Sequence, residues 1–178
     1  MIFSLLGQAF VGWLLADFLS GLVHWMEDRV LRMDTPILGP AVVIPNRVHH
    51  TDPLKFTNSS FIRRNEWLWM AVALISIPLW FVVPVALWAA MTLGGLIVNE
   101  VHRLAHRPAL GGPIVRTLQE IGLFQSPRHH AGHHRLPTDT RYCILTNWLN
   151  PLLDRFGVWN GLERFLGWIH LEPNRGMA

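Results

Sequence analysis

A long apolar stretch without any charged residue, Trp67 to Val98, sets the strongest limit on the fold of the chain. As one helix rising 1.5 Å per residue it would extend to roughly 50 Å, well beyond a hydrocarbon core of about 30 Å. Pro78 and Pro84 lie near its middle, where proline breaks or kinks a helix. The stretch therefore predicts a helical hairpin, with an outgoing arm over residues 67–82 and a returning arm over residues 85–101.

A second apolar segment, residues 2–25, is interrupted only by Asp17 and has about the 20 residues that a membrane crossing needs. It lacks the positive start of a signal peptide and exceeds the usual apolar length, so we expect a retained helix. Apolar residues make up 51% of the chain. These features predict an all-α, multi-pass membrane protein with about three transmembrane helices, in a single domain over residues 1–178.

The basic residues indicate the orientation of these helices. All 15 Lys and Arg lie either between Arg29 and Arg64 or between Arg103 and Arg175. Positive residues favour the cytoplasmic side, so both regions are expected there, with the N-terminus outside. We expect the location to be a bacterial inner membrane, with a helical cap in the cytoplasm.

Two later segments, residues 114–124 and 144–169, mix apolar, aromatic and charged residues in an amphipathic way. They are interpreted as cytoplasmic or interfacial helices. The second one suits a helix in the headgroup plane, and packing on the cytoplasmic cap explains it equally well. Its apolar positions are Trp148, Leu152, Phe156, Trp159, Leu162, Phe165 and Trp168.

Composition excludes several classes of protein. The single Cys143 excludes an internal disulfide framework and a multi-cysteine metal site, and we interpret it as a packing residue. The sequence pI is about 10.0, but no basic run or aromatic–basic motif indicates nucleic acid as a partner.

Histidine has the most unusual distribution in the chain. Nine of the ten histidines fall into four groups, all on the cytoplasmic face in the expected topology. Histidine is costly beside a bilayer and seldom gathers there without a ligand. The groups are His24; His49 and His50; His102 and His106; and His129, His130, His133 and His134.

These imidazoles predict a metal centre. Imidazole suits Zn, Cu, Fe and Ni, and a closed zinc site uses only four ligands, so nine candidates indicate two metals. Nitrogen-rich ligation of a metal pair favours oxygen activation over hydrolysis. Asp28 and Asp52 are expected to orient imidazoles through the second ring nitrogen. Asp17, seven residues before His24 on the same helix face, is interpreted as a further partner of an imidazole, and the alternative is a polar contact at membrane depth.

The spacings His24-Trp25-x-x-Asp28, His49-His50-x-Asp52-Pro53, Asn99-x-x-His102-x-x-x-His106 and His129-His130-x-x-His133-His134-x-x-Pro137 resemble those of the lipid desaturase domain family. That family includes plasmanylethanolamine desaturase and the chloroplast desaturase of phosphatidylglycerol palmitate. The segments Tyr142-Cys143-Ile144 and Trp148-Leu149-Asn150 extend the similarity over nearly the whole chain. Asn147 departs from the pattern, because relatives have glycine there.

The resemblance implies two Fe ions, O2 as co-substrate, a membrane phospholipid substrate and a small electron carrier of the cytochrome b5 or ferredoxin type. Its first implication is a desaturase that forms the vinyl-ether double bond of plasmalogens. The alternatives are an acyl-lipid desaturase, a fatty-acid or sterol hydroxylase with the same site, and a membrane metal transporter or metal-binding protein. The implied ligands and catalytic residues are His24, His49, His50, His102, His106, His130, His133 and His134, with His129 and Asp28 as further metal candidates.

Overall fold

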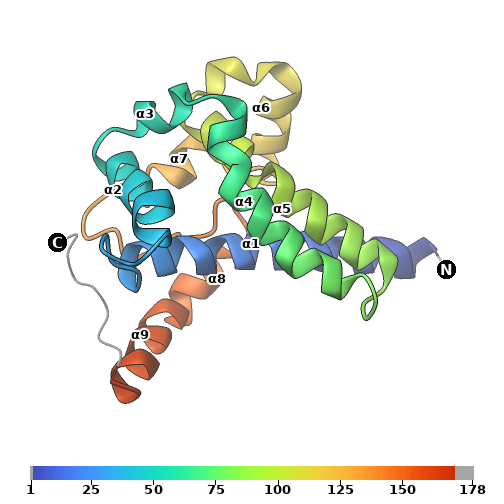
Figure 1. Cartoon of the computed structure of the whole chain (residues 1–178). Coiled ribbons are helices and arrows are strands. Elements are labelled where there is room, and N and C mark those ends of the chain that lie inside the picture. Colours follow the sequence, from blue (N-terminus) through green and yellow to red (C-terminus); the bar gives the residue numbers. More distant parts are fainter. Residues whose placement is uncertain (1, 171–178) are drawn as a thin grey trace.

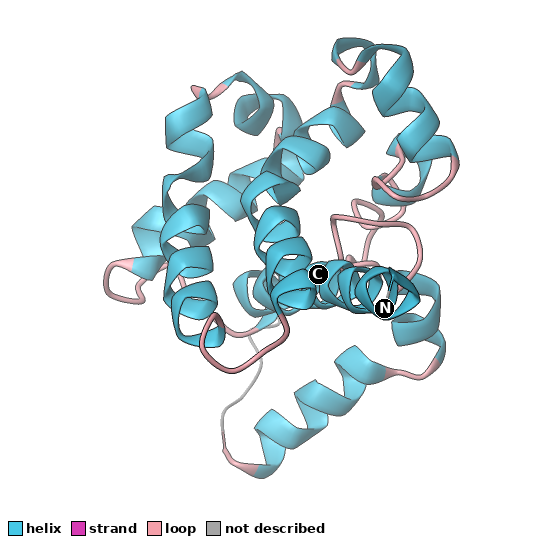
Figure 2. Cartoon of the chain, turned by 90° about the vertical axis from the view of Figure 1, so that its right-hand side faces the viewer, coloured by secondary structure: helices cyan, strands magenta, loops and turns pink. Residues whose placement is uncertain are grey.

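The computed structural model describes residues 2–170, and every regular element among them is helical (Figure 2). The expected all-α class is confirmed for these residues; the last part of the expected domain, residues 171–178, lies outside them. The elements are α1 (Ile2–Arg29), the π-helical turn η1 (Gly39–Val43), α2 (Ile44–Thr51), α3 (Pro53–Asn58), α4 (Phe61–Leu79), α5 (Val85–His106), the 3-10 turn η2 (Pro108–Leu110), α6 (Gly112–Glu120), α7 (Pro127–His130), α8 (Asn150–Arg155) and α9 (Val158–Trp168).

The expected helical hairpin is formed by α4 and α5, which are joined by residues 80–84 (Figure 1). Pro78 lies in the last turn of α4 and Pro84 directly precedes α5, so both prolines lie at helix ends. Several side-chain bonds tie the arms together; for example, Trp88 Nε1 donates to Ser76 O and Asn99 Nδ2 to Arg64 O, each at 2.7 Å. The returning arm continues to His106, so its last turns carry two of the histidines.

α1 crosses α5 at positions occupied by small residues. A Cβ atom at Gly12 would overlap the carbonyl oxygen of Leu87, so only glycine permits this approach of the two backbones. One turn further on, Ala16 packs directly against Gly94. The crossing holds α1 and α5 close together on the way to the histidines that lie near their C-terminal ends.

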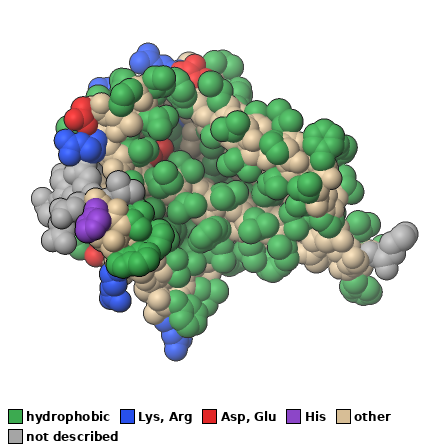
Figure 3. All heavy atoms as spheres, turned by 60° about the horizontal axis from the view of Figure 1, so that its bottom comes forward, with side chains coloured by type: hydrophobic (Ala, Val, Ile, Leu, Met, Phe, Trp, Pro, Cys, Tyr) green, Lys and Arg blue, Asp and Glu red, His purple; other side chains and the backbone are tan. Residues whose placement is uncertain are grey.

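Among the described residues, α1 and α5 are long and apolar enough to cross a membrane. α4 is not, because its first turns carry Arg63, Arg64 and Glu66. The N-terminus of α1 and the hairpin loop lie at the same end of the molecule (Figure 1). Exposed apolar side chains cover this end, whereas charged side chains gather toward the other (Figure 3); the exposed residues include Phe3, Leu6, Leu74, Phe81, Val82 and Val85.

Asp17 does not orient an imidazole, as the sequence had indicated. Its fully buried carboxylate binds the segment before α8: Oδ1 accepts from Leu145 N and Thr146 N at 3.0 Å each, and Oδ2 accepts from the Thr146 hydroxyl. These bonds satisfy backbone donors of a segment that is not helical, so residues 144–149 run alongside α1 instead of joining the expected helix over 144–169. The interpretation of Asp17 as a partner of an imidazole is therefore wrong. Its role is structural, because it binds this segment to α1.

The rest of the segment expected to be an interfacial helix forms two helices, α8 and α9, separated by Gly157 in the left-handed region with φ 63°. The inner face of α9 contributes buried Trp159, which packs near Trp25 of α1. Arg29 Nε donates to Glu163 Oε1 at 2.7 Å and fixes α9 to the end of α1. The outer face of α9 leaves Phe165 and Trp168 exposed.

Candidate metal centre

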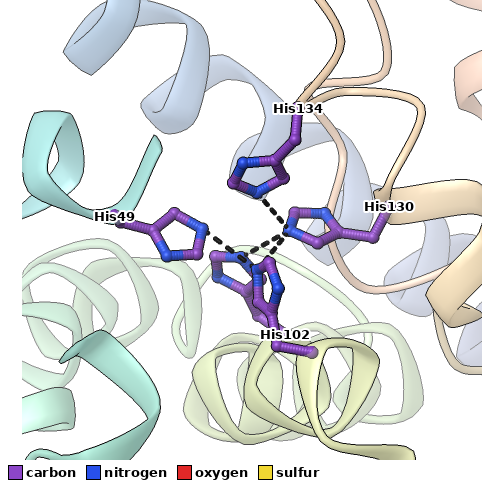
Figure 4. A group of neighbouring side chains, drawn as sticks. His49, His102, His130 and His134 are labelled. Carbon is purple, nitrogen blue, oxygen red and sulfur yellow. Dashed lines mark hydrogen bonds between the residues drawn. The ribbon is translucent and has the colours of Figure 1, made fainter. Parts of the chain in front are cut away.

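Four helices and one turn bring the predicted histidines together. Figure 4 shows four of them, His49, His102, His130 and His134, with their rings turned toward one another. α1 contributes His24 and Asp28, α2 contributes His49 and His50, and α5 contributes His102 and His106. α7 ends at His130, and His133 and His134 lie in the turn that follows. Residues separated by more than 100 positions in sequence thus meet at one end of the α1–α5 pair.

One set, the five-histidine group, consists of His49, His102, His106, His130 and His134, whose nearest ring nitrogens all lie within 4.8 Å of one another. The Nε2 atom of His130 lies 2.9 Å from that of His102, 2.7 Å from that of His106 and 3.0 Å from that of His134. The His106 and His49 Nε2 atoms are 3.2 Å apart.

Hydrogen bonding does not explain this convergence. An imidazole nitrogen either carries one proton to donate or offers one lone pair, so His130 Nε2 makes a good hydrogen bond to one of its three neighbours at a time. An ion does explain it. Imidazole nitrogens bind metals at about 2.1 Å, and two ligands at a right angle around one ion then lie about 3.0 Å apart. The observed distances of 2.7 to 3.2 Å fit ligands that share an ion.

The second set, the Asp28 group, consists of Asp28, His24, His50 and His133, also with ligand atoms within 4.8 Å of one another. Asp28 Oδ1 is 3.0 Å from His50 Nε2, and Asp28 Oδ2 is 3.3 Å from His133 Nε2 and 3.8 Å from His24 Nε2. The Nε2 atoms of His24 and His133 are buried without a hydrogen-bond partner. Buried polar atoms are rarely left unpaired, so these nitrogens fit ligands of a second ion.

The opposite ring nitrogens of two histidines are fixed by the backbone. His24 Nδ1 pairs with Tyr142 O at 3.1 Å, and His133 Nδ1 with Thr140 O at 2.6 Å. A carbonyl only accepts, so each Nδ1 carries the proton and each Nε2 offers its lone pair toward Asp28. Asn46 Nδ2 donates to Asp28 Oδ1 at 2.5 Å and holds the carboxylate in place.

The sequence interpretation missed these three orienting residues. Tyr142 and Thr140 act through carbonyl groups, which no side-chain pattern reveals. Asn46 could have been found, because it lies one turn before His49 and His50 on the same short helix.

The two groups adjoin each other. His50 of the Asp28 group lies with its ring centre 5.0 Å from that of His134, and the His133 and His134 rings are 5.8 Å apart. His102 and His130, like His24 and His133, are at most 5% exposed. The arrangement can therefore hold two ions side by side in a site that excludes bulk water.

Burial also keeps the rings in the form that binds metals. Desolvation, with repulsion from neighbouring imidazoles, lowers the pKa of His49 and of His130 far below the usual value, and that of His134 to about 2. Imidazoles with such low pKa values are neutral at physiological pH, and neutral imidazole is the ligand form.

Several predicted residues lie outside both groups. The Nε2 atom of His129 accepts from Asn150 Nδ2 at 3.1 Å, and burial lowers the pKa of His129 to about 4. Asp52 is exposed between α2 and α3 and bonds no imidazole of residues 2–170, so the role expected for it is wrong. Asn147 Oδ1 accepts from Ser126 N at 2.9 Å, and the Ser126 hydroxyl in turn accepts from His129 N at the start of α7.

Comparison with known proteins agrees with this geometry. The family model of the lipid desaturase domain matches residues 13–175. The chain is 34% identical to plasmanylethanolamine desaturase of Myxococcus xanthus over 92% of its own length and 61% of that protein. It is 37% identical to plasmanylethanolamine desaturase 1 of Mus musculus over 85% of its length and 61% of that protein.

A plant relative, the chloroplastic fatty acid desaturase 4-like 1 of Arabidopsis thaliana, is 29% identical over 88% of the chain and 55% of the plant protein. The chain thus spans about three-fifths of the length of the first two relatives. No solved structure shows significant similarity to it. With the family model covering most of its residues, the chain belongs to the lipid desaturase domain family.

Proposed function

We propose that the chain is an O2-dependent di-iron desaturase that forms the vinyl-ether double bond of plasmalogens in an alkyl-ether phospholipid. The observation that carries this proposal is the pair of adjoining ligand groups, one of five imidazoles and one of three imidazoles with Asp28. Relatives named plasmanylethanolamine desaturase, at 34% and 37% identity, support the choice of substrate.

Iron at these groups would supply the activation of O2 and the removal of two hydrogens from neighbouring carbons of the lipid. The ligands we propose are the nine residues of the two groups. The chain itself fixes the rings, by the carbonyls of Tyr142 and Thr140 and by the amide of Asn46. It also excludes water around the buried imidazoles, which protects reactive species from side reactions.

We further propose that α1 and the α4–α5 hairpin enter the membrane from the cytoplasmic side that holds the histidines, with the α1 N-terminus and the hairpin loop at the outer side. The exposed apolar side chains at that end support this orientation. The outer face of α9, with Phe165, Trp168 and the exposed Arg164, suits the headgroup plane. A small electron carrier of the cytochrome b5 or ferredoxin type would then reach the site from the cytoplasm of a bacterial cell.

The test is lipid mass spectrometry of cells that contain an alkyl-ether phosphatidylethanolamine and express the full chain. We expect a new acid-labile lipid, lighter than its precursor by two hydrogens. The variant His133→Ala removes a ligand of the Asp28 group and should abolish this product. His170→Ala is the matched control, because this exposed histidine follows α9 and belongs to neither group.

Three outcomes would contradict the proposal. A product that is heavier by one oxygen would identify a hydroxylase, and an unsaturated acyl chain with the ether lipid unchanged would identify an acyl-lipid desaturase. An unchanged amount of product in His133→Ala would show that the reaction does not depend on the Asp28 group.

A further inference from the structure

A pocket of about 320 Å³ opens beyond the C-terminal end of α1, outside both ligand groups. It is lined by Arg32, Met33 and Asp34 from the loop after α1 and by Arg47 from α2. Its volume is at the lower end of the range for small-molecule sites, which suits a small polar group. Of the lining residues that the structure describes, Arg32, Asp34 and Arg47 are charged.

The pocket and the Asp28 group each have a residue on α2. Arg47 lies next to Asn46, whose side chain donates to Asp28 Oδ1, and three residues before His50, whose Nε2 atom is 3.0 Å from the same carboxylate. Residues three apart in a helix lie on one face and are separated by about one turn, or roughly 5 Å along the axis. A group bound at Arg47 is therefore held about one helical turn from the proposed metal ligands.

The charges of the pocket are of both signs. The Arg32 side chain donates from Nε to Asp34 Oδ1 at 3.0 Å, and both side chains are 72% exposed. An ion pair this exposed is worth little, so a ligand can replace it at small cost. Two guanidinium groups and one carboxylate complement a ligand that carries an anionic phosphate and a cationic amine.

We propose that this pocket binds the phosphoethanolamine headgroup of the lipid substrate, with the phosphate between Arg32 and Arg47 and the ammonium at Asp34. Guanidinium binds phosphate through paired N–H donors, and Asp34 offers the carboxylate that the lining has among residues 2–170. The inference rests on the proposed function, because it assigns the headgroup of that substrate.

The position of the pocket also selects the carbons that react. Only a few bonds, through the glycerol backbone, separate the phosphate from the first carbons of the alkyl chain. A headgroup held one turn from His50 therefore places the start of the chain, rather than its middle, at the ligand groups. Mid-chain carbons would lie well beyond this distance in an extended lipid.

The experiment offers the purified, iron-loaded full chain in detergent an equal mixture of 1-O-alkyl phosphatidylethanolamine and 1-O-alkyl phosphatidylglycerol, with O2 and a chemically reduced ferredoxin as electron donor. Vinyl-ether products and bound lipid are both measured by mass spectrometry, so that binding is recorded even without turnover. We expect wild type to favour the ethanolamine lipid, Asp34→Asn to reduce that preference about fivefold, and Asp34→Lys to reverse it. Arg32→Gln should weaken retention of both lipids. Glu120→Gln and Arg116→Gln, on the exposed surface of α6, are the matched controls.

The outcomes separate the two proposals. If wild type forms vinyl ether but both Asp34 variants keep its headgroup preference and Arg32→Gln keeps its retention of lipid, the pocket is not the headgroup site and the proposed function stands. If no vinyl ether forms while bound lipid still changes with Asp34, the proposed function is wrong and the headgroup site stands. Equal shifts in Glu120→Gln would show a general charge effect and overturn the inference.

Discussion

Replacing Asp17 by alanine tests whether this buried carboxylate anchors the 144–149 segment. The change leaves Leu145 N and Thr146 N without their acceptor, and both residues are fully buried. An unsatisfied buried donor costs about 1–3 kcal/mol, so two of them reduce the free energy of unfolding by about 2–6 kcal/mol. For a chain of this size each kcal/mol lowers Tm by about 2–4 °C, which gives a fall on the order of 5–20 °C.

The assay is thermal unfolding of the full chain in detergent, with iron content measured on the folded fraction. Asp17→Asn is the matched control, because its Oδ1 can still accept from both backbone N–H groups while its amide faces the Thr146 hydroxyl. We expect a loss of about 1–2 kcal/mol for this control. Iron per folded chain should remain at the wild-type level, since Asp17 contacts no imidazole. An unchanged Tm in Asp17→Ala, or loss of iron from well-folded protein, would refute the anchoring role.

The remaining predictions concern helix packing, the ligand groups, the metal and the membrane face. Gly12→Ala should lower the free energy of unfolding by about 1–3 kcal/mol, because the new Cβ overlaps Leu87 O. Gly7→Ala is the control and should cause no such loss, because the space around Gly7 is open. Equal Tm values for the two variants would contradict this packing of α1 on α5. His129→Ala should keep the wild-type iron content, measured by elemental analysis, and a loss would make His129 a ligand. A chelator should lower the Tm measured by calorimetry, because the ions bind only the folded chain and so stabilise it. An unchanged Tm would contradict this stabilisation by bound ions. A polarity-sensitive dye on Trp168→Cys should report an apolar setting after reconstitution in vesicles, since Cys143 is buried and stays unlabelled, and a water-like signal would contradict contact of this face of α9 with headgroups.

The sequence allowed the helical class, the hairpin and the grouping of the histidines to be predicted, because each rests on a local signal. An uncharged stretch with two prolines indicates a hairpin, and the hairpin returns His102 and His106 to the side of His49 and His50. The structure brings these residues together, with His106 and His49 Nε2 atoms 3.2 Å apart.

The division of ligands between two groups could not be predicted, because it depends on contacts between distant elements. His49 and His50 are adjacent in sequence but belong to different groups, since neighbouring side chains in a helix point about 100° apart. His130 and His133 are divided in the same way, because α7 ends at His130 and the chain then turns. Asp17 was misinterpreted because it lies on the same face of the helix as His24, which suggested that the two side chains act together. In the structure its carboxylate instead accepts from the backbone of Leu145 and Thr146, a contact between distant parts of the chain.

Metal analysis of the purified full chain tests the central claim most directly, that the two groups each hold an ion. We predict about two irons per chain in wild type and about one in His133→Ala, with wild-type content in His170→Ala. A single ion per wild-type chain, or two ions that persist when His133 is removed, would contradict the account.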